Sequence, residues 1–344
     1  MCYHRPVSFL KSLLLPRLSI AVVLAVTIAV PAFAAPRQVA SPARGLAPRA
    51  AGRLVPANLQ FQALPLERSR QNHLLLRASI NGKPALLGVD TGAPISAIAI
   101  SRASHFGMVP VGARSDVPKR LRINGKYNEV VVARGLQLGA LNLVDQPLVA
   151  IDLVGSSKAA KLMKEQAIDG ILGADILFPT EAVLDCRTPM LMLKIDPDAR
   201  GSMPGVSYRG MSGVPMQLSS GYNLYVDGRV NGRRARLMVD TGAFTTLLHQ
   251  RFVRQMKIPL RDTLFNSAGV NLKNRGVQIA TISRLSIGNV HMRSKQVGVI
   301  DLDGLIRGGL LDASPPVAGL LGSEILERHN GIIDFRTRTL YLTK

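Results

Sequence analysis

The chain has 344 residues, of which 47% are hydrophobic, so its length allows about two domains and its composition allows a large buried core. Aromatic residues make up only 4% and tryptophan is absent, so aliphatic side chains must fill that core. The formal net charge of +21 favours contact with anionic surfaces, but no lysine and arginine block interleaved with aromatic residues is present, which argues against a nucleic-acid-binding domain.

The N-terminus has the pattern of a targeting signal. Basic residues precede an apolar run over residues 18–30, and a small-x-small cleavage site follows at residues 32–34. The run is shorter than the ~18 residues expected of a membrane span. The pattern therefore predicts a cleaved signal peptide over residues 1–34 and a periplasmic or secreted protein, with an uncleaved membrane anchor as the alternative.

Residues 35–57 are rich in Ala, Pro and Arg and show no periodicity, which predicts a disordered leader. The mature chain would begin near Ala35 and would keep a single thiol, Cys186, because Cys2 leaves with the signal. One cysteine cannot form an internal disulfide. We expect Cys186 to be a buried strand residue rather than a nucleophile.

Beyond the leader, the chain contains two copies of one plan. In each copy an Asn-Gly pair, beginning at Asn81 or Asn231, precedes an apolar run that ends in the tetrad Asp-Thr-Gly-Ala. The tetrads begin at Asp90 and Asp240, 150 residues apart. Four later segments match in order at an offset of 149: 136–139 with 285–288, 151–153 with 300–302, 170–177 with 319–326, and 184–187 with 333–336. Matches in this order indicate a duplicated domain.

Within each copy, short apolar runs separated by Asn-Gly, Gly and Pro predict hairpins and small barrels. The Asn-Gly pairs predict two-residue turns that lead into the Asp-bearing strands. Few segments have the composition of a helix. Helices are expected only over residues 157–167 and 245–256. The predicted domains are an N-terminal lobe over 58–197, an inter-lobe connection over 198–216 and a C-terminal lobe over 217–344.

Each Asp of the tetrads follows an apolar strand, at the edge of a predicted core. A carboxylate there is costly unless it is solvated, hydrogen-bonded or paired. A pseudo-twofold arrangement of the two copies could bring both turns face to face, and two carboxylates in contact share a proton, so that one acts as base and the other as acid. The alternative is that both residues only cap turns, which a single Asp-Thr-Gly would favour.

The matched motifs resemble those of aspartic proteases of the retropepsin and pepsin type, most of all bacterial single-chain relatives with two retropepsin-like units. In that family each half contributes an Asp-Thr/Ser-Gly turn and a later strand of two apolar residues and a glycine, matched here at Gly173 and Gly322. The resemblance covers nearly all of residues 73–344. It implies a mostly β protein with two pseudo-symmetric acid-protease β-barrel lobes and a cleft between them.

The resemblance also implies roles for individual residues. Asp90 and Asp240 would hold and activate the attacking water of an aspartic endopeptidase, a hydrolase that requires no metal and no cofactor. The loops that carry them would be supported by Thr91, Gly92, Ala93, Thr241, Gly242 and Ala243, and the threading strands by Gly173 and Gly322. An acid follows each threading strand, but it is Asp175 in one copy and Glu324 in the other.

The family closes a hairpin, the flap, over its substrate. The counterpart in the first lobe is residues 123–131 with Tyr127, and in the second lobe residues 266–279 with Gly269 and Gly276. Which lobe supplies the working flap stays open, and the favoured interpretation of Tyr127 is an ordinary hairpin side chain, with a substrate-gating role as the alternative.

The expected partners are a peptide or protein substrate and an anionic envelope surface. Nucleic acid is not expected, and a monomer is expected because both catalytic residues lie in one chain. The five histidines beyond the signal show no metal-ligand spacing, so structural or surface roles are expected for them. The alternative function is a non-catalytic protein of the same fold that binds peptides or the anionic envelope.

Overall fold

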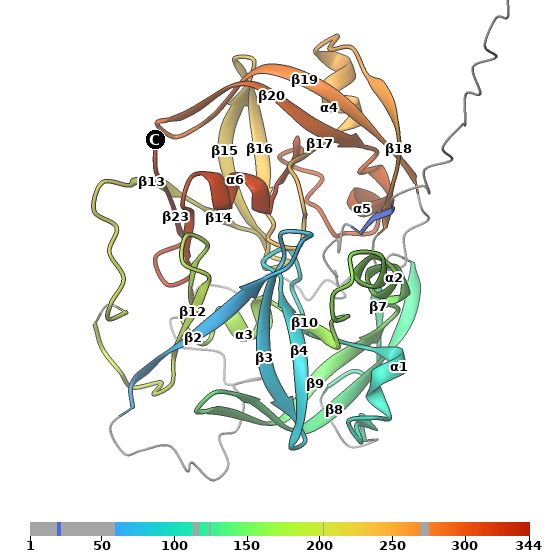
Figure 1. Cartoon of the computed structure of the whole chain (residues 1–344), viewed down its shortest axis with the longest axis vertical. Helices are drawn as coiled ribbons and strands as arrows, with labels where there is room; N and C mark the ends of the chain where they lie inside the picture. The colour runs from blue at the N-terminus through green and yellow to red at the C-terminus, as the bar shows by residue number, and fades with distance from the viewer. Residues whose placement is uncertain (1–18, 22–58, 113–116, 124, 202, 269–274) are drawn as a thin grey trace, which may run out of the picture.

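The computed structural model describes residues 19–21 and 59–344, apart from residues 113–116, 124, 202 and 269–274. Strands dominate it, as Figure 1 shows, and they form two lobes of similar plan, which confirms the predicted mostly β, two-lobed acid-protease fold. The predicted leader lies outside the described residues, and so does the predicted signal except for the strand β1 (Ser19–Ala21). Within the described part, no helix combines the length and apolar character needed to cross a membrane.

The first lobe is built mainly from strands, with three short helices. Its strands are β2 (Phe61–Arg68), β3 (Leu74–Ile80), β4 (Lys83–Val89), β5 (Ala97–Ala99), β6 (Val109–Pro110), β7 (Arg120–Ile123), β8 (Lys126–Leu138), β9 (Leu141–Ile151), β10 (Gly170–Leu172), β11 (Val183–Asp185) and β12 (Met190–Lys194). Its helices are α1 (Ile100–Ala103), α2 (Val154–Leu162) and α3 (Ala174–Leu177).

The second lobe follows the same order of elements. Its strands are β13 (Ser212–Pro215), β14 (Gln217–Leu218), β15 (Leu224–Val230), β16 (Arg233–Val239), β17 (Leu247–His249), β18 (Arg261–Ala268), β19 (Arg275–Ile287), β20 (Val290–Ile300), β21 (Gly319–Leu321), β22 (Ile332–Asp334) and β23 (Thr339–Leu342). Its helices are α4 (Gln250–Gln255), α5 (Asp303–Arg307) and α6 (Ser323–Arg328).

Strand pairing is repeated between the lobes. In the first lobe β10 lies parallel to β4 and antiparallel to β5, and in the second β21 lies parallel to β16 and antiparallel to β17. The long hairpin β8–β9 corresponds to β19–β20 in the same way. The duplication seen in the sequence is therefore a duplication of hydrogen-bonding topology.

Both Asn-Gly pairs form the two-residue turns that were predicted. The φ angles are 49° and 79° at Asn81 and Gly82, and 48° and 84° at Asn231 and Gly232. Two consecutive positive φ angles define a type I′ turn, whose twist matches that of the strands it joins. Each turn thus aligns the strand that leads to an Asp-Thr-Gly loop.

The core is aliphatic, as the composition requires. Buried Leu, Ile, Val and Ala side chains from both lobes form its main cluster, and Phe106 and Tyr225 are the largest fully buried side chains. Cys186 is buried directly after β11, and burial raises the pKa of its thiol to about 12. A thiol that stays protonated in this way is a poor nucleophile.

A sheet made from both lobes joins them. Its strand order is β13-β23-β22-β11-β12-β2, and the two lobes meet where β11 pairs antiparallel with β22. The segment 198–216, predicted as a connection, contributes β13 to this sheet, where it pairs with β23. The joining sheet lies on the left of the molecule in Figure 1.

The two expected helices differ from those observed. The helix expected over 157–167 is α2, which begins earlier because the Asp152 carboxylate accepts a hydrogen bond from the Val154 amide at 2.8 Å. The helix expected over 245–256 is reduced to α4. The preceding residues Leu247–His249 form β17 instead, because they pair with β20 and β21 in the buried sheet.

Candidate active site

The two Asp-Thr-Gly loops lie next to each other at the ends of two equivalent strands. Asp90 follows β4 and Asp240 follows β16, and their exposed fractions are 2% and 0%. The threading strands hold both loops, because the amide of Asp90 donates to the carbonyl of Leu172 and the amide of Asp240 donates to that of Leu321, each at 3.0 Å. The position of each carboxylate is therefore set by the buried sheet of its own lobe.

Reciprocal hydrogen bonds between the two threonines link the loops. The hydroxyl of Thr91 donates to the carbonyl of Val239 at 2.8 Å and accepts from the amide of Thr241 at 3.1 Å. The hydroxyl of Thr241 donates to the carbonyl of Val89 at 2.7 Å and accepts from the amide of Thr91 at 3.0 Å. These four buried bonds fix the two loops relative to each other across the lobe boundary.

Backbone amides orient each carboxylate. Oδ1 of Asp90 accepts from the Gly92 amide at 2.8 Å, and Oδ1 of Asp240 accepts from the amides of Gly242 at 2.8 Å and Ala243 at 3.1 Å. Oδ2 of each aspartate is buried without a hydrogen-bond partner among the described residues. Each loop thus uses one carboxylate oxygen structurally and leaves the other for a ligand.

The carboxyl groups are in direct interaction. Gly92 is packed so tightly on the opposite loop that a Cβ added to it would lie 2.7 Å from Cγ of Asp240. At this separation the negative charge of Asp90 acts directly on the Asp240 carboxyl. Only glycine at position 92 allows this approach.

The pair holds one proton near neutral pH. Burial raises the pKa of Asp90 to about 6, against the lowering effect of its hydrogen bonds. Burial and the negative charge of Asp90 raise the pKa of Asp240 well above its ordinary range. Because two adjacent carboxylates cannot both ionise easily, one of the two, Asp90, ionises before the other.

Two glycines allow the threading strands to pass behind the loops. A Cβ on Gly173 would lie 2.6 Å from the Ala93 carbonyl oxygen, and a Cβ on Gly322 would lie 2.3 Å from the Thr245 carbonyl carbon. Both distances are shorter than any van der Waals contact, so the close approach requires glycine. This is the physical reason for the apolar-apolar-glycine motif in each copy.

The acids that differ between the copies perform the same task. Oδ1 of Asp175 accepts from the Ser96 amide at 2.8 Å, and Oε2 of Glu324 accepts from the Thr246 amide at 2.8 Å. The longer side chain of Glu324 also forms an ion pair, in which its Oε1 lies 3.1 Å from Nζ of Lys295. The longer side chain therefore supports its loop in an equivalent way.

A family model for aspartyl proteases matches residues 76–176 and again residues 226–325, so it covers each lobe once and more than half of the chain. The chain belongs to the aspartyl protease family. Among solved structures, the crystal structure of Basic 7S globulin from soybean is similar, with 11% identity, a TM-score of 0.42 and coverage of 83% of this chain and 94% of that chain. No curated protein matches the chain in sequence.

Both lobes carry a hairpin where an aspartyl protease has its flap. In the first lobe β7 pairs with β8 around Gly125, and Tyr127 is 70% exposed on the returning strand. In the second lobe β18 pairs with β19, whereas Gly269 lies outside the described residues. A substrate-covering role for either hairpin stays a prediction.

One histidine for which a structural or surface role was expected, His73, lies near the backbone of Gly242, in the second Asp-Thr-Gly loop. Its side chain is half-buried, and its Nε2 has no hydrogen-bond partner among the described residues. Burial lowers the pKa of His73 to about 4, so the imidazole is neutral at neutral pH. The matching position of the second copy, Asn223, lies 150 residues later and is polar and buried. Two polar residues at matching positions could have directed attention to His73.

One group of potential metal ligands is present in the second lobe, formed by His249, Asp301 and Asp303. The Leu302 amide donates to Nδ1 of His249 at 3.2 Å, which places the proton of the neutral imidazole on Nε2. That nitrogen lies 3.3 Å from Oδ1 of Asp303. The contact links β17 to α5, and the three side chains are placed so that they could also hold a metal ion.

Proposed function

We propose that this protein is an aspartic endopeptidase, in which a water held by Asp90 and Asp240 attacks the peptide bond. The observation that carries the proposal is the pair of adjacent buried carboxyls, each with Oδ1 held by loop amides and Oδ2 without a partner. A buried polar atom of this kind normally has a partner, so its lack here favours a site for water and substrate.

The proposed chemistry needs one proton in the pair. Ionised Asp90 accepts a proton from the water as the water oxygen attacks the carbonyl carbon, and protonated Asp240 donates its proton to the carbonyl oxygen. Asp90 then gives its proton to the amide nitrogen while Asp240 takes a hydroxyl proton from the resulting diol, so that the C–N bond breaks and the amine and the carboxylic acid leave. General acid–base help of this kind contributes ~10²–10⁴-fold to the rate. The pKa of about 6 at Asp90 and the still higher pKa of Asp240 support this division of roles.

We expect an extended peptide to bind as an added strand, held by main-chain hydrogen bonds, with aliphatic pockets for its side chains. One feature supports this mode. The short strand β1 pairs in parallel with β18, the outer strand of the hairpin in the second lobe, with Ser19 opposite Asn266. In Figure 1 β1 lies between β18 and α2, so it spans from one lobe to the other.

The decisive experiment is cleavage of a diverse peptide library by the purified protein across pH, beside the Asp240→Asn variant. We expect cleavage by the wild type, inhibition by pepstatin-type compounds and loss of cleavage in Asp240→Asn. The matched control is Asp152→Asn, which makes the same substitution at an exposed turn and should leave cleavage unchanged.

The second candidate function is a non-catalytic protein of the same fold that binds peptides or an anionic envelope. The net charge of +21 is the observation that favours it. Peptide binding without turnover, equal in wild type and Asp240→Asn, would support this alternative and contradict the protease.

Export and maturation are part of the proposal. We propose a cleaved signal over residues 1–34, a periplasmic or secreted location and removal of the leader, residues 35–57, by the protein itself. Mass spectrometry of the mature N-terminus tests both steps. A start at Ala35 supports signal cleavage, and an Asp90→Ala protein with the same shorter N-terminus as the wild type would exclude self-processing.

A further inference from the structure

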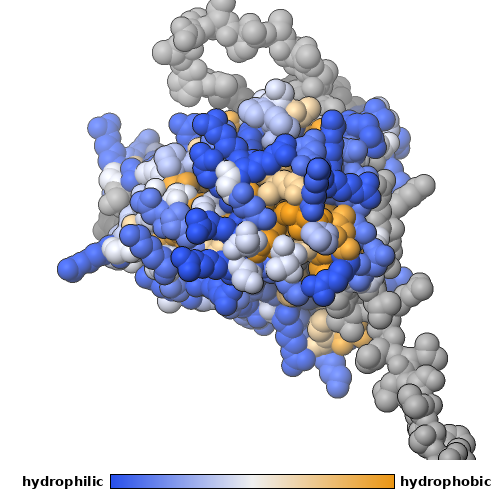
Figure 2. Space-filling view, turned by 90° about the horizontal axis from the view of Figure 1, so that it is seen from above, coloured by the Kyte–Doolittle hydropathy of each residue, from blue (hydrophilic) through white to orange (hydrophobic). Residues whose placement is uncertain are grey.

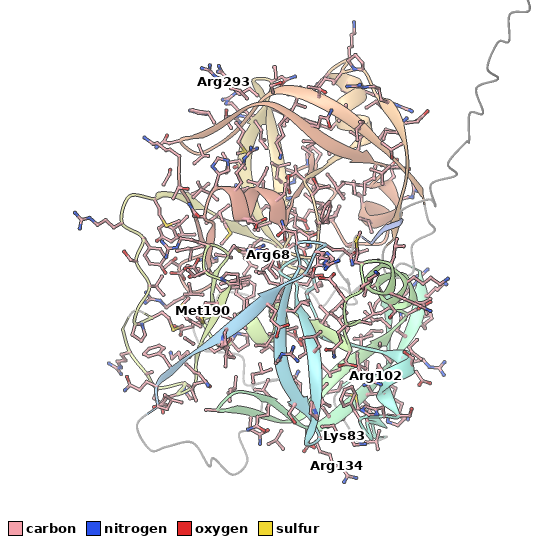
Figure 3. All side chains as sticks on the ribbon, in the orientation of Figure 1. Arg68, Lys83, Arg102, Arg134, Met190 and Arg293 are labelled. Atoms are coloured by element: carbon pink, nitrogen blue, oxygen red, sulfur yellow. The ribbon has the colours of Figure 1, made fainter. Side chains whose placement is uncertain are left out.

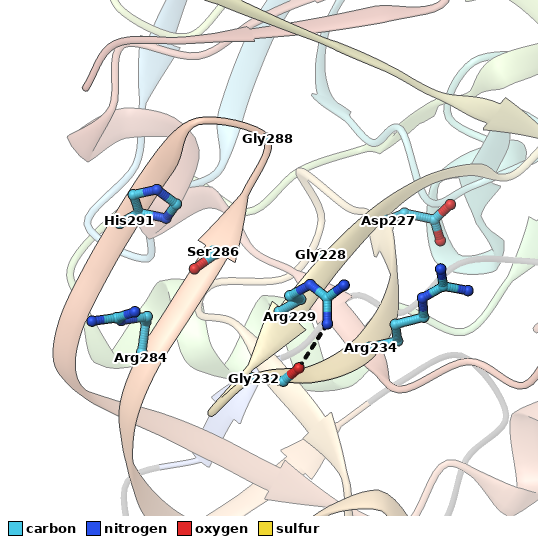
Figure 4. Close-up of a pocket in the computed structure, with 9 residues that line it drawn as sticks. All are labelled: Asp227, Gly228, Arg229, Gly232, Arg234, Arg284, Ser286, Gly288 and His291. Atoms are coloured by element: carbon cyan, nitrogen blue, oxygen red, sulfur yellow. Dashed lines mark hydrogen bonds between the residues drawn. The ribbon is translucent and has the colours of Figure 1, made fainter.

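A basic hollow lies on the second lobe, far from the Asp-Thr-Gly loops. Its volume is about 630 Å³, and Figure 4 shows the residues that line it: Asp227, Gly228, Arg229, Gly232, Arg234, Arg284, Ser286, Gly288 and His291. It is at the turn end of β16, whereas Asp240 follows the other end. Arg234 is six residues before Asp240, which at ~3.3 Å per residue places them ~20 Å apart.

The basic side chains of the hollow form one row across four strands. Arg234 on β16 is opposite Arg229 on β15, which is opposite Ser286 on β19, which is opposite His291 on β20. Directly opposite residues point to the same face of a sheet. Arg284, two residues before Ser286, shares this face and is itself opposite Arg293. The sheet thus presents basic groups from all four strands to one side.

The first lobe provides an internal control, because it has the same row without charge. There Pro84 on β4, Ser79 on β3, Gln137 on β8 and Asn142 on β9 are opposite one another in the same order. The counterpart of Arg284 is Gly135, by the offset of 149. The fold therefore does not require basic residues at these positions.

The arrangement is unfavourable without a ligand. Like charges directly opposite each other in a sheet are destabilising, and here this applies to Arg229 with Arg234 and to Arg284 with Arg293. No ion pair joins any of these four arginines to an acid within the described residues. The nearby Asp227 instead accepts a hydrogen bond from Gln217 at 2.8 Å, and Arg229 donates to the carbonyl of Gly232 at 2.9 Å.

We propose that this hollow is a binding site for a compact anion that carries phosphate groups. Guanidinium groups match phosphate oxygens with paired hydrogen bonds, and three arginines line this hollow. A volume of about 630 Å³ suits a small ligand or a single headgroup. No Phe, Tyr or Trp lines the hollow, so it lacks the stacking platform that single-stranded nucleic acid uses.

Two sources could supply such phosphates, a soluble molecule or a lipid headgroup displayed on a membrane. Figure 2 shows that hydrophilic residues dominate the surface at the end of the second lobe, around a smaller hydrophobic area. Either source could reach the hollow from solvent, because Arg229, Arg234 and Arg284 are all exposed. The site is independent of catalysis, because it shares no residue with the Asp-Thr-Gly loops.

The test compares two triple variants that lose the same charge. The first carries Arg229→Gln, Arg234→Gln and Arg284→Gln, in the hollow. The control carries Arg134→Gln, Arg200→Gln and Arg209→Gln, which are exposed and lie outside the second-lobe strands. Figure 3 shows Arg134 at the opposite end of the molecule from Arg293. Calorimetric titration with inorganic pyrophosphate measures binding of a soluble phosphate compound. Co-sedimentation with phosphatidylcholine vesicles, with or without phosphatidic acid, measures binding to a lipid headgroup.

We expect the hollow variant to weaken pyrophosphate binding at least ~10-fold and the control less than ~2-fold, because charge-assisted bonds to phosphate depend on local geometry. If the wild type and the control variant bind phosphatidic acid vesicles and the hollow variant does not, a lipid headgroup is the source of the phosphate. The hollow variant should melt at the same temperature as the wild type or higher, since repulsion is relieved. Equal weakening in both variants, no binding to the wild type, or tighter binding of polyglutamate or single-stranded DNA than of pyrophosphate would overturn the proposal.

Discussion

At the residue scale, the buried pair Asp90 and Asp240 lowers the stability of the folded protein at neutral pH. Two carboxyls that are 2% and 0% exposed keep raised pKa values because burial penalises their charged forms. The folded protein therefore binds protons at these groups more tightly than the unfolded chain does. Their contribution to stability is fully present below about pH 4, the ordinary range of an aspartate, and is lost as pH rises through about 6 and beyond.

The Asp240→Asn variant should consequently have a higher free energy of unfolding than the wild type at neutral pH. Asparagine has similar size and no ionisable group, so the cost of keeping a proton on the buried carboxyl disappears. Chemical denaturation at pH 7 and at pH 3.5 checks this. The gain should vanish at the lower pH, and a destabilised variant at pH 7 would contradict the assigned pKa shifts.

The dyad also predicts the pH dependence of cleavage. Below pH 6 both carboxyls are protonated and no base is available, so kcat/KM should rise with pH and reach half its maximum near pH 6, the pKa of Asp90. His73 should not disturb this rise, because its pKa is lowered to about 4. A profile of kcat/KM between pH 3 and 9 measures it. An optimum of kcat/KM near pH 3 would contradict this prediction, because it would mean that solvent keeps the pKa values of the two carboxyls in their ordinary range.

At the scale of elements, the threading strands decide whether the loops can form. The residue pattern predicted both strands, because an apolar pair followed by glycine is a local signature. It did not predict that residues 247–249 would be a strand rather than the start of a helix. Helix propensity is a local property, whereas β17 depends on partners about 50 and 70 residues away in the chain.

Gly322→Ala tests the importance of the close approach. The added Cβ would lie 2.3 Å from the Thr245 carbonyl carbon, so the strand or loop must move, and we expect a loss of ~3 kcal/mol or more in unfolding free energy together with loss of cleavage. Gly304→Ala is the control in the same lobe, because its Cβ would meet nothing within 4 Å. Thermal melts of both variants measure the difference, and equal melting temperatures would contradict the packing argument.

At the scale of the whole molecule, one chain supplies both halves of the site. The four threonine bonds cross from one lobe to the other, and the joining sheet pairs β11 with β22. These contacts bring residues 150 positions apart into one buried cluster. The lobes are thus held together by backbone pairing as well as by side-chain packing.

We therefore predict that the protein works as a monomer. Specific activity should stay constant over a 100-fold dilution, because no residue of the dyad has to come from a second copy. Analytical ultracentrifugation at the same concentrations provides the control for mass. Activity per mole that falls on dilution, in step with a dimer-to-monomer change, would contradict this prediction.

The sequence by itself determined the duplication, the type I′ turns, the Asp-Thr-Gly loops and the glycines behind them. Each of these depends on a local backbone requirement, or on a repeat that is visible without knowing any contact. Only the tertiary structure decided that His73 lies near the Gly242 backbone, and that basic residues of four strands share one face of the sheet in lobe two. Those arrangements depend on strand register and lobe packing, which join residues that no local pattern connects.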